Sequence, residues 1–92
     1  MCRSIQTLYN VDPAPTPAEV RAAALQFVRK LSGFREPSQA NTGAFERAVD
    51  EVSAASMRLL HGLSTSAPPR DRAVMAARAR ERRAAREHAP AR

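Results

Sequence analysis

The chain has 92 residues and a formal net charge of +6 at pH 7, and this length suits one domain without a second independent core. A multi-step enzyme is therefore not expected. Hydrophobic residues make up 43% of the sequence, but Ile, Leu, Val and Phe together number only 16 of 92, which predicts alanine-rich helices around a small core.

The positive charge is concentrated towards the C-terminus. Residues 1–67 carry seven Lys and Arg against six Asp and Glu, a net +1, whereas residues 68–92 carry eight Arg against three acids, a net +5. A basic block of this kind attracts nucleic acid, an anionic membrane or an acidic protein surface. The alternative that needs no partner is a solvated helix rich in Arg and Ala.

Membrane and secretion signals are missing from the sequence. No run of about 18 apolar residues occurs, so we expect no membrane span. Polar residues interrupt the apolar stretch that a signal peptide would need at the N-terminus. The single cysteine, Cys2, cannot form an internal disulfide, which favours a reduced, cytoplasmic location.

Residues 1–16 are predicted to form an N-terminal arm. Four apolar residues between positions 5 and 11 fit either one helical turn or an extended strip, and periodicity over so short a run leaves both open. The prolines of segment 12–16 bias the residues before them away from helical angles, which predicts a stiff connector.

A first helix is predicted over residues 17–32. Thr16 at the N-cap, proline at the first helical position and Glu19 three residues after the cap form a capping box. Gly33 can adopt the left-handed conformation that ends a helix, with Phe34 folding back onto the apolar face. That face is predicted from three- and four-residue spacing and comprises Val20, Ala24, Phe27, Val28 and Leu31.

A second helix is predicted to end at Gly62. Its N-cap is left open between Ser38 and Asn41, because Gly43 weakens the first turn if the helix begins early. The short link to the first helix predicts an antiparallel hairpin over residues 17–63. The apolar stripe of the second helix comprises Phe45, Val49, Val52, Ser56, Leu59, Leu60 and Leu63.

Residues 64–92 are predicted to form a polar loop and a third helix. Pro68 and Pro69 can begin this helix, because its first amide groups need no internal partner. Its apolar face is almost entirely alanine, so it should dock weakly and its last turns should fray. The predicted fold class is all-α, an antiparallel helical hairpin with an N-terminal arm and a third, Arg-rich C-terminal helix. The arm, the start of the third helix or a second copy of the chain must complete the core.

Several short motifs resemble those of one family. They include Met1-Cys-Arg-Ser-Ile5, the turn Ser32-Gly-Phe34 and the segment Ala67-Pro-Pro-Arg-Asp71. On these residues the chain is similar to small bacterial proteins catalogued as domain of unknown function 2277, whose members open Met-Cys-Arg-Asn-Ile. Ser4 stands where Asn is more usual. The resemblance supports the domain limits and implies no activity, ligand or catalytic residue.

Cys2 is the candidate reactive or metal-binding residue. Removal of the initiator methionine would leave an amine and a thiol that together chelate a metal or attack an electrophile. No spacing argument brings His61 or His88 to Cys2 as a base, and burial as a small residue is the alternative. One cysteine and two distant histidines exclude a structural zinc site. We therefore expect no catalytic residue and no cofactor, and the sequence favours a non-enzymatic protein.

The arginines form a candidate nucleic-acid-binding site. Arg78, Arg82 and Arg86 recur every fourth residue and make one basic stripe, beside which Arg83 can pair with Glu87. Unpaired like charges one turn apart are unfavourable unless a polyanion neutralises them. The predicted binding residues are Arg78, Arg80, Arg82, Arg83 and Arg86 on the third helix, and Arg29, Lys30 and Arg35 near the first turn, where Ser38 and Asn41 add hydrogen-bonding groups.

The sequence therefore favours a non-enzymatic module that binds nucleic acid or a ribonucleoprotein through the Arg-rich helix. With all three Phe assigned to the core, Tyr9 is the only accessible aromatic residue expected, so contact with the phosphate backbone is favoured over base stacking. The alternative is a protein-interaction module, either a homodimer or an adaptor for an acidic protein partner that completes the core. A metal or redox role that depends on Cys2 is a minor alternative.

Overall fold

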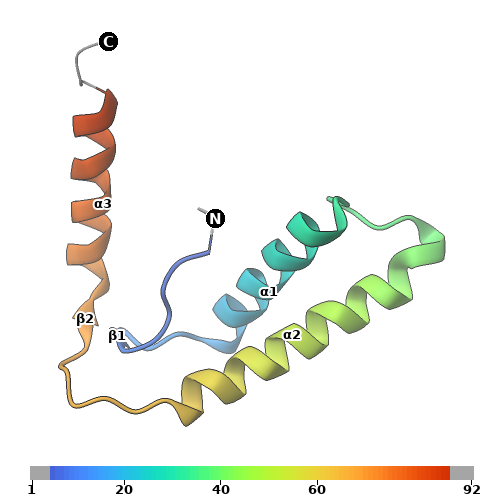
Figure 1. Ribbon diagram of the computed structural model, residues 1–92, viewed down its shortest axis with the longest axis horizontal. Coiled ribbons are helices and arrows are strands. Elements are labelled where there is room, and N and C mark those ends of the chain that lie inside the picture. Colours follow the sequence, from blue (N-terminus) through green and yellow to red (C-terminus); the bar gives the residue numbers. More distant parts are fainter. Residues whose placement is uncertain (1–4, 88–92) are drawn as a thin grey trace.

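The computed structural model describes residues 5–87, and most of them lie in three α-helices (Figure 1). The predicted all-α class is confirmed, with one addition, a parallel pair of two-residue strands. In chain order the elements are β1 (Val11–Asp12), α1 (Pro17–Ser32), the 3-10 turn η1 (Gln39–Asn41), α2 (Thr42–Gly62), β2 (Arg70–Asp71) and α3 (Arg72–Glu87).

Helix α1 has the ends that the sequence predicts. The Thr16 hydroxyl accepts a hydrogen bond from the Glu19 amide at 3.2 Å, and the Glu19 carboxylate accepts one from the Thr16 amide at 3.0 Å. These reciprocal bonds satisfy amide groups that the helix itself leaves without partners. Gly33 ends α1 in the left-handed region, with a φ of 78°, and its amide donates to the Arg29 carbonyl at 2.9 Å.

Helix α2 begins at Thr42, which resolves the open choice of N-cap in favour of Asn41 by position. Neither candidate caps the helix through its side chain. Instead, the Ser38 carbonyl accepts bonds from the Asn41 amide at 2.9 Å and from the Thr42 hydroxyl at 3.1 Å. The backbone carbonyl at the start of the turn η1 therefore accepts the hydrogen bonds at this end of α2, and no side chain caps the helix.

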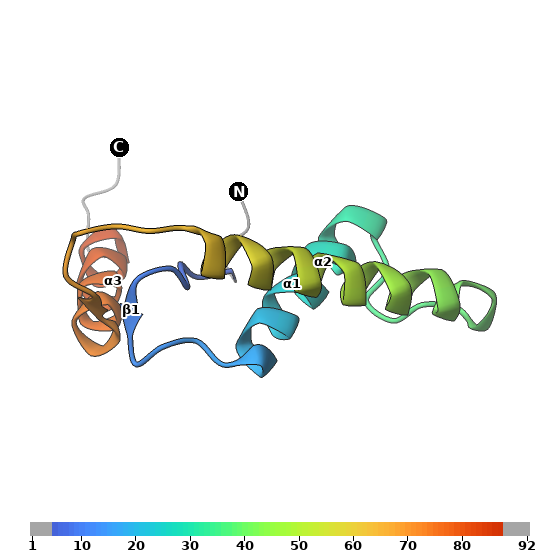
Figure 2. The same cartoon turned by 90° about the horizontal axis from the view of Figure 1, so that it is seen from below.

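The core lies where α1 and α2 cross. Ala24 and Val28 of α1 pack with Phe45 and Val49 of α2, and all four are buried. The chain reverses direction between the two helices, and they cross at an angle (Figures 1 and 2). Contact between them is therefore concentrated near the crossing.

Several residues predicted for the core are instead exposed. Leu31, near the end of α1, is 76% exposed, and Leu59, near the end of α2, and Leu63, directly after it, are 59% and 45% exposed. The assignment of all three Phe to the core is wrong for Phe27 and Phe34, which are 45% and 42% exposed. Periodicity identifies the apolar face of a helix but not how much of that face its neighbour covers.

The predicted start of the third helix at Pro68 and Pro69 is also wrong. Residues 70–71 form β2, in which Arg70 pairs with Val11 of β1, and α3 begins only at Arg72. The Asp71 carboxylate accepts hydrogen bonds from the amides of residues 73 and 74, at 2.8 and 3.2 Å. The Asp71 side chain therefore caps the N-terminus of α3, which begins after the prolines and not at them.

Asn10 joins the arm to the loop before β2. Its side-chain amide donates to the carbonyls of Ala67 and Pro68 at 3.3 and 3.2 Å, and its own carbonyl accepts from the Arg70 amide at 2.9 Å. Its φ of 55° lies in the left-handed region, which Asn adopts more readily than most residues. Through these contacts the arm is connected to the start of α3.

Helix α3 stands apart from the other two helices (Figure 1). None of its residues, 72–87, is buried, and Val74 is 44% exposed. An ion pair between Arg72 and Glu19 joins the first residue of α3 to α1. Among the described residues, no helix is both long and apolar enough to cross a membrane.

Candidate nucleic-acid interface

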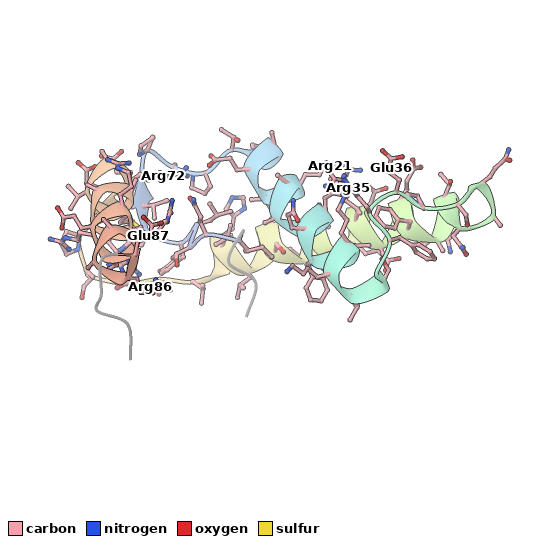
Figure 3. All side chains as sticks on the ribbon, turned by 90° about the horizontal axis from the view of Figure 1, so that it is seen from above. Arg21, Arg35, Glu36, Arg72, Arg86 and Glu87 are labelled. Atoms are coloured by element: carbon pink, nitrogen blue, oxygen red, sulfur yellow. The ribbon has the colours of Figure 1, made fainter. Side chains whose placement is uncertain are left out.

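The N-terminal arm and α3 form a groove of about 520 Å³, which we call the arm groove. Viewed along α3, the ribbon of the described arm approaches the helix where β1 pairs with β2 (Figure 3). Five arginines and no acidic residue line this groove. Its lining residues are Ile5, Gln6 and Thr7 of the arm, Arg70 of β2, and Arg72, Met75, Ala76, Arg78, Ala79, Arg82 and Arg83 of α3.

The arm groove takes in part of the predicted arginine stripe. Arg78, Arg82 and Arg83 line the groove itself. Arg86 lines an adjoining hollow of about 630 Å³ together with Arg82, Arg83 and one acid, Glu87. Arg80 lines neither hollow. The helical repeat therefore brings four of the five predicted residues to one side of α3.

No arginine of this stripe forms an ion pair within residues 5–87. Across residues 5–87, the recorded ion pairs join Arg21 to Asp50, at 2.6 Å, and Arg72 to Glu19. The predicted pairing of Arg83 with Glu87 is not among them. Because several positive charges lie on neighbouring helical turns, they repel one another and together attract anions to this side of α3.

Arg72 is the one arginine of the groove that is held by an acid. Its Nη1 donates to Glu19 Oε2, while Glu19 Oε1 accepts from the Thr16 amide. The hydrogen bond from Arg72 is the main reason that the pKa of Glu19 lies below its ordinary value, and the Thr16 amide adds to the effect. Glu19 therefore remains ionised and orients the Arg72 guanidinium.

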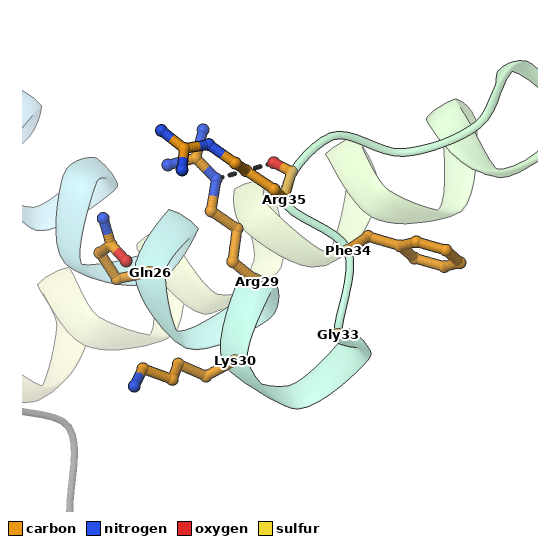
Figure 4. Close-up of a pocket in the computed structure, with 6 residues that line it drawn as sticks. All are labelled: Gln26, Arg29, Lys30, Gly33, Phe34 and Arg35. Carbon is orange, nitrogen blue, oxygen red and sulfur yellow. Dashed lines mark hydrogen bonds between the residues drawn. The ribbon is translucent and has the colours of Figure 1, made fainter.

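The smaller predicted cluster lies at the other end of α1. Arg29, Lys30 and Arg35 line a hollow of about 370 Å³ together with Gln26, Gly33 and Phe34 (Figure 4). Arg29 Nε donates to the Arg35 carbonyl at 3.0 Å, and the two guanidinium groups lie together while Lys30 points away from them. Ser38 and Asn41 do not line this hollow, and their side chains bond to each other at 2.8 Å.

Sequence reasoning missed Arg70, Arg72 and the arm residues 5–7 as parts of one site. The missing information was the pairing of β1 with β2, which brings the arm to α3 across more than half the chain. A strand pair of two residues leaves no periodic pattern to read. The nearest signal was Asp71, whose residue type is typical of a helix N-cap and would have moved the predicted start of the helix.

The candidate metal or reactive residue is Cys2. Cys2 and His88 lie outside the described residues, and His61 is exposed at the end of α2. Between residues 5 and 87, no three His, Cys, Asp or Glu side chains gather so as to hold a metal ion.

Comparisons with known proteins give a family and no activity. The sequence profile of DUF2277, described as an uncharacterized conserved protein, matches residues 1–78. This range contains α1, α2 and the start of α3, whereas Arg80, Arg82, Arg83 and Arg86 lie beyond it. No curated protein and no solved structure matches the chain.

Proposed function

The chain belongs to the DUF2277 family of uncharacterized conserved proteins, and because this membership carries no activity, we propose a function from the surface of the chain itself. The protein is a non-enzymatic module that binds the phosphate backbone of nucleic acid, free or within a ribonucleoprotein. The interface is the arm groove and the adjoining side of α3. The single cysteine of the sequence favours a cytoplasmic setting for this role.

The observation that carries the proposal is the set of five arginines in one groove without an acid. Only Arg72 among them takes part in an ion pair recorded within residues 5–87. Holding like charges on adjacent turns is unfavourable, and binding a polyanion removes this repulsion while releasing its counterions. A groove lined in this way therefore favours a chain of phosphates over a neutral ligand.

The form of α3 supports contact with a duplex. None of its residues is buried, so the helix is accessible over most of its circumference, and the major groove of B-DNA accommodates a single α-helix. No aromatic residue lines the arm groove, which disfavours the base stacking used by proteins that bind single strands. Phe27 and Phe34, although exposed, belong to α1 and the turn after it.

The proposal is tested by comparing two double variants that remove equal charge. R78Q/R82Q removes two arginines of the arm groove, whereas R47Q/R58Q removes two exposed arginines of α2. Gln has a helix propensity similar to that of Arg, so helix content should be unchanged in both variants. Binding to a generic duplex is measured by fluorescence anisotropy over a series of salt concentrations.

For R78Q/R82Q we expect weaker binding and a logarithmic salt slope reduced by about two units, since each neutralised phosphate contributes about 0.9. For R47Q/R58Q we expect a slope equal to that of the parent. Equal slopes in all three proteins, or no duplex binding by the parent at low salt, would exclude the arm groove as a nucleic-acid interface.

A second candidate function is a protein-interaction module, and the exposed apolar side chains favour it. Leu31 and Leu59, predicted for the core, are 76% and 59% exposed, and burying them against a partner would be favourable. An interface of this kind depends weakly on salt, whereas phosphate binding weakens steeply as salt rises. The same salt series therefore separates the two functions.

A further inference from the structure

The nitrogen atoms of Arg72 have unequal surroundings. Nη1 is bonded to the Glu19 carboxylate, but Nε and Nη2 are shut off from solvent without a hydrogen-bond partner. A buried donor that has lost water and gained no partner is costly to the folded state. Native structures therefore rarely leave such groups unpaired unless a water, an ion or a ligand completes them.

The two unpaired groups lie on one edge of the guanidinium. Nε and Nη2 point their N–H bonds in parallel and form the fork that binds two oxygens of a carboxylate or a phosphate at once. The opposite side of the group is held in place by Glu19, which is itself held by the Thr16 amide. The unpaired fork is therefore oriented before any ligand arrives.

The nearby carboxylates are committed elsewhere. Glu19 uses one oxygen for Arg72 Nη1 and the other for α1. Asp71 accepts from the first amides of α3, and no acid lines the arm groove. Arg70 and Arg78 line the groove together with Arg72. Their charges favour a phosphoryl group, which has more than two oxygens, over a carboxylate.

We propose that the Arg72 end of the arm groove is a subsite for one phosphoryl group, bound by Arg72 through Nε and Nη2. The ligand of this subsite is the phosphoryl group alone. Its role as the anchoring contact for nucleic acid rests on the proposed function. Because both N–H groups are covered, binding requires the wall of the groove to move aside. Arm residues 5–7 form the part of that wall opposite α3.

The subsite is tested on the full chain with inorganic phosphate as the probe. Two-dimensional NMR spectra of the arginine Nε–H groups are recorded during a phosphate titration, with chloride at equal ionic strength as the control. We expect the Arg72 signal to shift and saturate with phosphate but not with chloride. An Arg72 signal that stays unchanged, or that responds equally to both anions, would overturn the subsite.

A pair of charge-preserving variants sharpens this test. Arg72→Lys keeps the charge and can keep the ion pair with Glu19, but it loses the two-pronged fork. Arg58→Lys makes the same exchange at an exposed position of α2. Phosphate affinity, followed on the remaining signals, should fall about tenfold or more in the first variant and stay constant in the second. Equal affinities would contradict bidentate binding.

The phosphoryl group can come from the end of a nucleic-acid strand or from within it. Two oligonucleotides of one sequence, with a 5′-phosphate or a 5′-hydroxyl, distinguish these sources. Tighter binding of the phosphorylated strand assigns the subsite to a terminal phosphate, and equal binding with a shifted Arg72 signal assigns it to an internal one. If the Arg72 signal responds to inorganic phosphate but the protein does not bind a duplex, the proposed function alone is overturned. If the protein binds a duplex but the Arg72 signal does not respond to phosphate, the subsite alone is overturned.

Discussion

Truncation of Phe45 tests how the α1–α2 crossing stabilises the protein. Phe45 is 9% exposed and packs with Ala24, Val28 and Val49. Phe45→Ala should therefore lower the free energy of unfolding by about 3–5 kcal/mol, the range for a large buried aromatic residue. Phe27→Ala is the matched control, because Phe27 is 45% exposed. Removing that half-buried ring should cost about 1 kcal/mol.

The measurement is urea unfolding followed by far-UV circular dichroism at several protein concentrations. If Phe45→Ala leaves too little folded protein to measure, Val49→Ala, at 3% exposed, should cost about 2 kcal/mol. A loss below about 0.5 kcal/mol for the buried residues would place the core elsewhere, since changes of that size are usual for surface positions.

The control also tests the second candidate function. If another copy of the chain covers Phe27, Phe27→Ala should cost nearly as much as Phe45→Ala, and the unfolding midpoint of the parent should rise with protein concentration. If the chain is a monomer, the midpoint should be independent of concentration. A large cost for Phe27→Ala at every concentration, without that dependence, would refute the burial on which this reasoning rests.

Two further predictions concern the arm and α3. A chain ending at Ala79 should keep most of its cooperative unfolding in the same urea assay, because the deleted part of α3 has no buried residue; loss of the transition would contradict this. At the other junction, Asn10→Ala should speed hydrogen exchange of the Arg70 amide, whose acceptor is the Asn10 carbonyl. Asn10→Gly should speed it less, because Gly accepts a positive φ without strain; equal effects would assign the role of Asn10 to its side-chain bonds alone.

Local signals predicted the ends of α1 well. The capping box of Thr16 and Glu19 and the left-handed Gly33 depend on residues within a few positions of each other, and all three take their predicted roles. The start of α3 was predicted less well, because its determinants are not local. Arg70 is held by the carbonyl of Asn10, so a contact with the distant arm keeps this position out of the helix.

The core was predicted by face but not by extent. Val28 and Leu31 lie on the same predicted stripe of α1, yet they are 6% and 76% exposed. The difference arises from the angle at which α1 crosses α2 (Figure 2), and this angle depends on how side chains of both helices interlock. Such packing is a property of the helix pair, which the spacing within either helix does not report.

The candidate site combines both kinds of determinant. Arg78 and Arg82 could be predicted to share a face because the helical repeat alone brings them together. Arg72 was missed because its importance comes from Glu19, which local reasoning had assigned only to the capping of α1. The Glu19 carboxylate thus makes one local contact, with Thr16, and one long-range contact, with Arg72. The long-range contact depends on the fold and could not be predicted from neighbouring residues.

The limit of the family match divides the proposed interface into two parts. Arg72 and Arg78 lie within residues 1–78, whereas Arg82 and Arg86 lie beyond them. The chain ending at Ala79 therefore keeps the proposed phosphoryl subsite and loses cations that extend the interface along α3. Because the salt slope counts the phosphates that are neutralised, this chain should retain the Arg72 response to inorganic phosphate while its slope for a duplex falls. Parallel loss of both would show that the two parts act as one site.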